Sequence, residues 1–132
     1  METAQLLLAP AIELFNRGDY FAAAEALERS AATAPADMKD LVGALNRIAA
    51  AMHLRFERGG RKGALMLLSQ AALALEDFRP ARAGIDIDRL CVELSAYTED
   101  LRATPRDEAA GLKGRALRFI ERRRAPKINL AP

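Results

Sequence analysis

A tight corner between two apolar runs, at residues 15–28, constrains the fold more than any other part of the sequence. The stretch reads FNRGDYFAAAEALE, and its corner contains Asn16, Gly18 and Asp19. Glycine suits the left-handed position that ends a helix, and aspartate can cap the next helix by accepting hydrogen bonds from backbone N–H groups. Because the connection is so short, the two flanking helices are expected to form an antiparallel hairpin.

Apolar residues recur at helical spacing along most of the chain. Asp37 and Asp86 are expected as further N-caps, and Pro10 is expected to kink the first helix or to mark a late start. The third helix has the best-defined core face, formed by Leu41, Leu45, Ile48, Met52 and Phe56. The spacing predicts helices over about residues 3–17, 19–32, 37–58, 61–78, 86–101 and, with a weaker pattern, 106–124.

Composition favours one all-helical domain. A chain of 132 residues can bury a core without a metal or a disulfide. Hydrophobic residues make up 51% of the chain but aromatic residues only 5%, so alanine and leucine supply most of the apolar area. We therefore predict an all-α, single-domain antiparallel bundle of five to six helices over residues 1–124, followed by a flexible basic tail at 125–132.

Cysteine usage and hydropathy indicate a cytoplasmic protein. The single cysteine, Cys91, has no partner for an internal disulfide, which is typical of a reducing compartment. No segment reaches the roughly 18 unbroken apolar residues of a membrane helix. The N-terminal stretch lacks the basic region of a signal peptide. We expect no membrane association.

Positive charge is concentrated near the C-terminus. Residues 105–132 hold eight Lys and Arg against three Asp and Glu, whereas the rest of the chain is slightly acidic. A basic stretch can neutralise phosphates, but RALRFIERRRAPK at 115–127 lacks interleaved aromatic residues. Nucleic-acid binding is therefore not expected, and a solvated helix end or a docking tail is favoured.

Three blocks of the sequence resemble a bacterial and archaeal family, domain of unknown function 309. The blocks are FNRGDYFAAAEALER, DLVGALNRIAAAMHLRFERGGRKGALMLL and GIDIDRL, within about residues 10–95. The resemblance implies a compact all-α bundle and no established activity. Where the family pattern has Glu, His and Trp, this chain has Ala22, Ala24 and Ala31, which weighs against catalysis. In the first block the matching residues are Phe15, Asn16, Gly18, Tyr20, Phe21, Glu25, Leu27 and Glu28.

A candidate polar cluster lies between the second and third helices. Glu25 and Glu28 share one side of the second helix because they are three residues apart. Asn46 and His53 share one face of the third helix, and Tyr20 can join them. Paired carboxylates can act as acid and base or bind a divalent ion. The favoured interpretation is structural: the two glutamates cap neighbouring helix ends or form ion pairs there, through Arg47, Arg55 or Arg58. We expect no metal site and assign no catalytic residue.

The glycine-rich loop RGGRKG at residues 58–63 is a candidate anion contact through Arg58, Arg61 and Lys62. Free N–H groups at a helix N-terminus can hold an anion. The loop lacks the spacing of a phosphate-binding P-loop. A tight turn between helices with solvated basic residues is therefore the favoured interpretation.

Two functional hypotheses follow from the sequence. The favoured one is a non-enzymatic module that binds a protein partner or a second copy of itself, with the apolar N-terminus (Leu6, Leu7, Leu8) and the alanine-rich second helix as contact surfaces. The alternative is a small-ligand, metal-binding or hydrolytic protein that uses Glu25, Glu28 and His53. No cofactor is expected under the favoured hypothesis.

Overall fold

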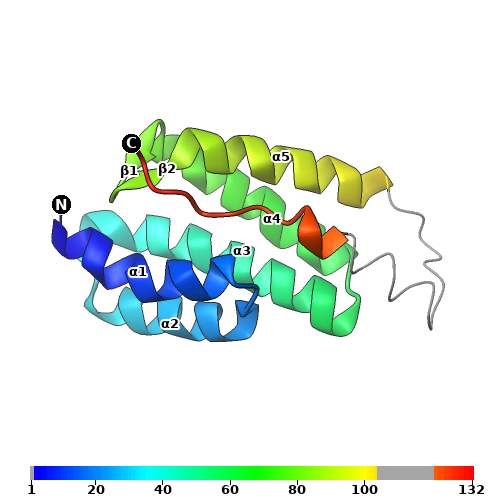
Figure 1. The fold of residues 1–132 in the computed structure, drawn as a ribbon, viewed down its shortest axis with the longest axis horizontal. Coiled ribbons are helices and arrows are strands. Elements are labelled where there is room, and N and C mark those ends of the chain that lie inside the picture. Colours follow the sequence, from blue (N-terminus) through cyan, green and yellow to red (C-terminus); the bar gives the residue numbers. More distant parts are fainter. Residues whose placement is uncertain (1, 104–120) are drawn as a thin grey trace.

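The fold is a bundle of antiparallel helices, described by a computed structural model over residues 2–103 and 121–132 (Figure 1). A 3-10 turn at Ala36–Met38 precedes the third helix, and another at Glu76–Phe78 follows the fourth. A hairpin of two short strands, β1 (Ala81–Arg82) and β2 (Ile85–Asp86), precedes the fifth helix. The prediction of an all-α bundle is confirmed. The α-helices of the described residues are α1 (Glu2–Asn16), α2 (Tyr20–Thr33), α3 (Lys39–Arg58), α4 (Lys62–Leu75) and α5 (Ile87–Ala103).

Helix α3 lies at the centre of the bundle. Each helix packs against the next one along the chain, and α3 has extensive contacts with both α2 and α4. Its predicted core face is confirmed, because four of the five side chains are fully buried and Phe56 is half-buried. Helix α5 also buries one face, which consists of Ile87, Leu90, Leu94, Tyr97 and Leu101.

The helix ends match some of the predicted caps and correct others. Gly18 has the expected left-handed conformation, with φ of 90°. Asp86 caps α5, since its Oδ1 accepts a hydrogen bond from Arg89 N at 3.0 Å. Asp19 precedes α2 but its side chain makes no capping hydrogen bond. Asp37 was expected to cap the third helix; it lies instead in a 3-10 turn, and α3 begins at Lys39.

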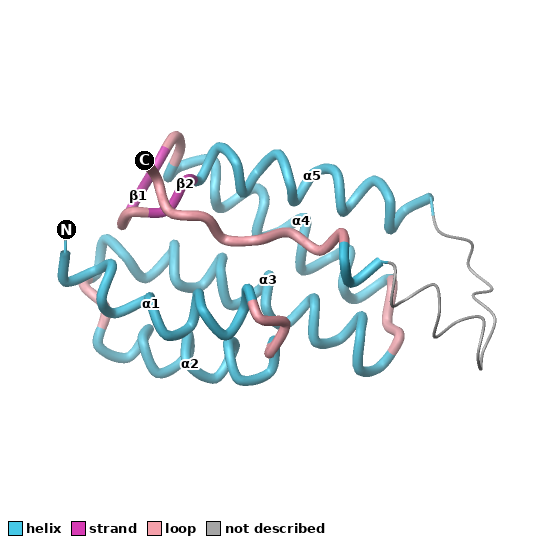
Figure 2. The backbone as a smooth tube through the Cα atoms, viewed as in Figure 1, coloured by secondary structure: helices cyan, strands magenta, loops and turns pink. Residues whose placement is uncertain are grey.

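The segment 125–132, here called the C-terminal strap, is packed against the bundle rather than flexible. Ala125 and Ile128 are buried, and the strap runs between α1 and α5 back towards the hairpin (Figures 1 and 2). Asp86 N donates to Asn129 O at 2.9 Å, and Ala131 N donates to Gly84 O at 2.8 Å. The strap thereby extends the hairpin. Of the helix predicted at 106–124, residues 104–120 lie outside the described part of the chain, and 121–123 are helical.

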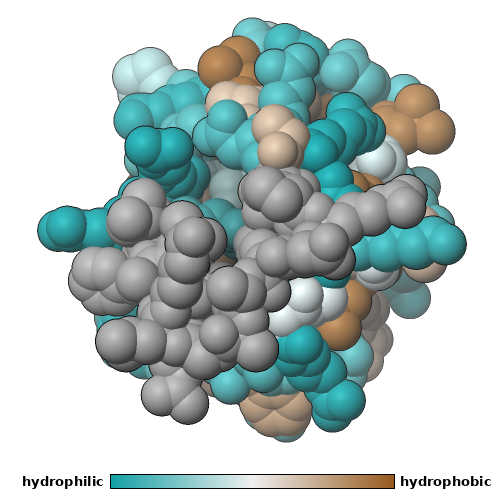
Figure 3. Space-filling view, turned by 90° about the vertical axis from the view of Figure 1, so that its right-hand side faces the viewer, coloured by the Kyte–Doolittle hydropathy of each residue, from teal (hydrophilic) through white to brown (hydrophobic). Residues whose placement is uncertain are grey.

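Hydrophilic residues predominate on one face of the molecule (Figure 3). Seen from the side turned towards the viewer in Figure 3, the described part of the surface is mostly hydrophilic, with separate hydrophobic patches. Within residues 2–103 and 121–132, no helix is both long enough and apolar enough to span a bilayer.

Candidate functional site

The residues of the predicted polar cluster differ in their exposure and in their contacts. Glu25 and Glu28 are exposed on α2. Tyr20 is buried among aromatic rings: its ring centroid lies 5.2 Å from that of Phe15 and 5.8 Å from that of Phe56. Tyr20 therefore lies in the core, whereas the two carboxylates lie on the surface.

The remaining two members of the predicted cluster each contact α2. Asn46 Nδ2 donates to Ala24 O at 2.9 Å, and the His53 ring packs on Phe21 with 5.2 Å between centroids. In the part of the chain that the structure describes, no hydrogen bond or ion pair joins any two members of the predicted cluster. Residues 2–103 and 121–132 contain no group of three His, Cys, Asp or Glu side chains arranged to hold a metal ion.

In the glycine-rich loop between α3 and α4, the basic residue Arg61 binds the end of α5. Gly59 ends α3 in the left-handed region, with φ of 72°. Arg61 Nε donates to Leu101 O at 2.9 Å, and its second nitrogen donates to Arg102 O at 2.5 Å. The last carbonyls of a helix lack partners within the helix, so Arg61 caps α5. Arg58 and Lys62 are exposed.

The corner at residues 15–20 receives the segment that leads into the strap. The Arg122 guanidinium lies over the Tyr20 ring at 5.6 Å and over the Phe56 ring at 5.3 Å. The same guanidinium donates to Gly18 O at 2.8 Å. Burial raises the pKa of Tyr20, and the nearby Arg122 charge opposes part of that rise. The aromatic faces thus hold a cation supplied by the C-terminal segment.

A buried ion pair anchors the same segment to α3 and α5. The Arg55 side chain is 1% exposed, and its Nε and second terminal nitrogen bind the Glu121 carboxylate, the closest contact being 2.8 Å. Tyr97 Oη donates to Glu121 Oε2 at 2.6 Å. Burial and this hydrogen bond raise the pKa of Tyr97 well above its usual value. Arg55 is one of the three arginines that the sequence offers as partners for Glu25 and Glu28, and in the structure it binds Glu121.

The Asn16 side chain holds the strap because it both donates a hydrogen bond to the strap backbone and accepts one from it. Its Nδ2 donates to Ile128 O and its Oδ1 accepts from Ile128 N, each at 2.8 Å. Lys127 Nζ donates to the Asn16 carbonyl at 2.9 Å. On the α5 side, Glu93 Oε1 accepts from Lys127 N at 3.0 Å. The side-chain amide of Asn16 therefore bonds both backbone groups of Ile128, as a residue of a neighbouring antiparallel strand would. The sequence placed Asn16 in the corner motif but gave no sign of its partner.

A groove of about 480 Å³ lies between α1 and the strap. We call it the α1–strap groove. Two large apolar side chains at the groove are mostly exposed, Leu6 at 75% and Leu130 at 66%. Of the predicted apolar N-terminus, Leu8 is fully buried and Leu7 is half-buried, so Leu6 alone faces outwards. The groove is lined by Gln5, Leu6, Ala9, Ile12, Glu13, Asn16, Ala83, Ile128 and Leu130.

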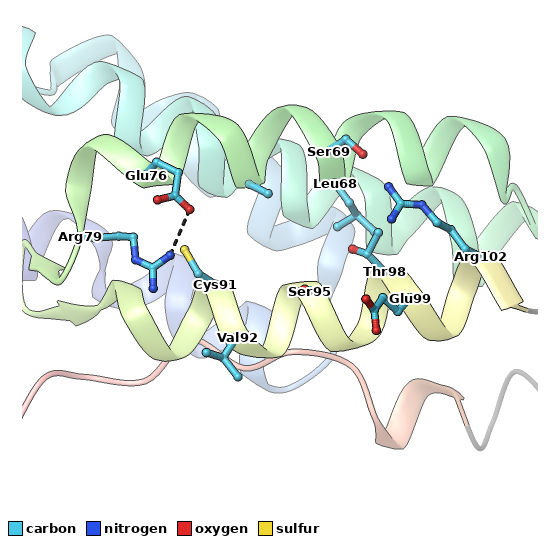
Figure 4. A pocket seen from close by; sticks show the side chains of 11 residues that line it. Leu68, Ser69, Glu76, Arg79, Cys91, Val92, Ser95, Thr98, Glu99 and Arg102 are labelled. Atoms are coloured by element: carbon cyan, nitrogen blue, oxygen red, sulfur yellow. Dashed lines mark hydrogen bonds and ion pairs between the residues drawn. The ribbon is translucent and has the colours of Figure 1, made fainter.

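A second groove, of about 410 Å³, lies between α4 and α5 (Figure 4). Glu76 and Arg79 form an ion pair at one end, with 3.0 Å between nitrogen and oxygen, and Glu99 and Arg102 lie at the other. Cys91 lines this groove. Burial raises the pKa of its thiol, although the charge of Arg79 acts in the opposite direction. The shift favours the neutral thiol over the nucleophilic thiolate.

Comparison with known proteins bears on the N-terminal half of the chain. The family model described as Domain of unknown function (DUF309) matches residues 8–67. No curated protein and no solved structure is significantly similar to the chain. The matched stretch runs from α1 through the corner, α2 and α3 into α4, and it includes the corner that receives the C-terminal segment. The family that the sequence blocks resemble is thus the one whose model matches residues 8–67 of this chain.

Proposed function

We propose that the chain is a non-enzymatic interaction module that binds a segment of a protein partner in the α1–strap groove. The observation that carries this proposal is the pair of exposed leucines, Leu6 and Leu130, at a groove whose lining is mainly apolar. Full burial of a leucine side chain is worth about 1.5–3 kcal/mol relative to leaving it in water. A partner that covers both leucines would gain that free energy.

The groove also specifies the charge of the segment it would bind. Among the described residues that line the groove, Glu13 is the only one with a charged side chain. Within the described residues, Glu13 has no ion-pair partner. An apolar segment that carries a lysine or arginine opposite Glu13 would therefore suit both the shape and the charge of the groove.

The walls of the groove are held before any partner arrives. Asn16 fixes the strap to the end of α1 through both of its amide atoms. The hairpin fixes the other end of the strap through Asn129 and Ala131. Binding to a preformed groove avoids part of the entropy cost of ordering a loop.

The test uses a fluorescein-labelled amphipathic helical peptide with leucines on one face and a lysine at the centre of that face. We expect fluorescence anisotropy to show saturable binding to the wild-type protein, weakened at least tenfold by Leu6→Glu or Leu130→Glu. Leu73→Glu is the matched control, because Leu73 is 77% exposed on α4 and outside the groove. Glu13→Lys is expected to reverse the preference towards a peptide with a central glutamate.

Equal affinity of the wild type and Leu6→Glu, or absence of saturable binding by either peptide, would contradict the proposal. The alternative function, a ligand or metal site at Glu25, Glu28 and His53, gains no support from the two exposed carboxylates. Under our proposal, replacing Glu25 and Glu28 by glutamine leaves peptide binding unchanged.

A further inference from the structure

The outward face of α4 carries apolar residues in an unusually uncharged setting. Between Lys62 and Glu76 the helix has no charged residue. Met66 is 59% exposed and Leu73 is 77% exposed. The opposite face of α4 is the core face, where Ala64, Leu68, Ala71 and Leu75 are all fully buried. An exposed apolar patch that polar residues surround is a mark of an interaction surface.

The order of residues along this outward face is self-complementary. At helical spacing this face carries the exposed residues Lys62, Met66, Ser69, Gln70, Leu73 and, in the following 3-10 turn, Asp77. Glu76 in the same turn is also exposed and forms an ion pair with Arg79. Counting outwards from the midpoint between Ser69 and Gln70, each member of the series has a counterpart at the same distance on the other side. A polar pair is followed by an apolar pair and then by a pair of opposite charges. We call this series the α4 face.

We infer that the α4 face binds the α4 face of a second copy of this chain, with the two helices antiparallel and a twofold axis between Ser69 and Gln70. Met66 then meets the partner subunit's Leu73, and Lys62 meets the partner subunit's Asp77. Because of the twofold axis, each of these interactions occurs twice in the dimer. In the described residues neither Lys62 nor Asp77 has an ion-pair partner within its own chain.

Charge selects the antiparallel arrangement over the parallel one. In a parallel pairing Lys62 would face the same lysine of the other copy and Asp77 the same aspartate, and like charges oppose association. The fourteen residues of α4 span about 21 Å at 1.5 Å per residue. A contact between single helices lies at the small end of interface sizes, where complexes are weak and transient. We therefore expect a concentration-dependent dimer.

This inference goes beyond the proposed function, since none of the α4 residues lines the α1–strap groove. The first experiment is sedimentation equilibrium from low micromolar to millimolar protein, in which the mass should rise from 14.4 kDa towards twice that value. Leu73→Glu and Met66→Glu should keep the protein monomeric across this range. Val92→Glu is the matched control on α5, where Val92 is 65% exposed, and it should leave dimerisation unchanged.

A charge exchange tests the register. Lys62→Asp and Asp77→Lys should each weaken the dimer about tenfold, because each places two pairs of like charges across the axis. The double variant should restore the wild-type dissociation constant. Circular dichroism should show native helicity in all variants, since the substituted side chains are exposed.

The inference is wrong if the wild-type protein stays monomeric at millimolar concentration, or if Val92→Glu disrupts the dimer as strongly as Leu73→Glu. A double charge variant that is as weak as either single variant would overturn the antiparallel register. Peptide binding in the α1–strap groove should be the same in Leu73→Glu and in the wild type, so failure of the dimer and failure of the proposed function give different results.

Discussion

Single residues in the corner at positions 15–20 contact a segment more than 100 positions away in the sequence. Asn16 binds Ile128, the Gly18 carbonyl accepts from Arg122, and the Tyr20 ring supports the Arg122 guanidinium. Asn16, Gly18 and Tyr20 all lie within the stretch that matches the family model, residues 8–67. Their side chains and carbonyl groups bind the C-terminal segment, so the corner serves to anchor that segment to the bundle.

The buried charge of Arg55 makes Glu121 a sensitive position. Glu121→Gln removes the carboxylate that binds Arg55 and accepts from Tyr97. Leaving a buried charge without its counter-ion typically costs about 3–5 kcal/mol, and we expect about 3 kcal/mol here because Glu121 is 15% exposed. Urea unfolding measures this change. Glu99→Gln, at an exposed site, should change the free energy of unfolding by less than about 0.5 kcal/mol.

The two tyrosines should make stability fall at high pH. Burial raises the pKa values of Tyr97 and Tyr20 in the folded state, whereas in the unfolded chain tyrosine ionises near pH 10. Above that pH the unfolded state binds fewer protons than the folded state, so the free energy of unfolding decreases by up to about 1.4 kcal/mol per pH unit for each tyrosine that stays protonated in the folded state. Tyr97→Phe should roughly halve this slope between pH 10 and 11. An unchanged slope would mean that Tyr97 ionises in the folded protein as it does when unfolded.

At the scale of elements, the hairpin and the strap depend on each other. Each strand of the hairpin has only two residues, and its turn places both Ala83 and Gly84 at positive φ, 52° and 75°. Positive φ at both turn residues is typical of a type I′ hairpin, for which Asn-Gly is the usual sequence. Two strands this short are marginal in water. Their pairing with Asn129 and Ala131 adds the hydrogen bonds of a third segment.

Asn16→Ala should loosen the strap without unfolding the helices. The substitution removes two hydrogen bonds to Ile128, worth about 1–3 kcal/mol together. Hydrogen exchange by NMR should show faster exchange at the amides of Ile128 and Lys127, while the core amides of α3 stay protected. Asn46→Ala is the control, because Asn46 bonds to Ala24 and not to the strap. Equal protection of Ile128 in wild type and Asn16→Ala would contradict the role of this clamp.

At the scale of the whole molecule, the two anchors of the C-terminal segment should be coupled. Glu121 and Asn16 hold the same stretch of chain at two points. Once one anchor is lost, the segment is partly released, and the other anchor stabilises the folded state less. In a double-mutant cycle, the combined destabilisation of Glu121→Gln and Asn16→Ala should be smaller than the sum of the single effects. Strict additivity would show that the two contacts act independently.

The helical part of the fold could be predicted from the sequence, because helical periodicity and caps are local signals. The core faces of α3 and α5 and the Asp86 cap follow from residues within a few turns of each other. The hairpin could not be predicted, since Ala83 is not a usual turn residue. The strap shows only one strongly apolar buried residue, Ile128, between Lys127 and Asn129. Its packing depends on partners far away in the chain.

The candidate site was the least predictable part for the same reason. Glu25 and Glu28 were chosen because their spacing on a helix is a local pattern, and they are exposed. The contacts that organise the groove join residues 16 and 128, and those that bury a charge join residues 55 and 121. Nothing in the spacing of a single sequence indicates such pairs.

The separation of 112 residues between Asn16 and Ile128 also bears on the order of folding. Hairpins of adjacent helices form from local contacts and form quickly, whereas contacts between distant residues must first overcome the entropy of closing a long loop. The helices should therefore assemble first and the strap should dock last. Until it does, the gap between α1 and α5 stays open, and the folding chain passes through a state whose half-built groove is exposed to other molecules.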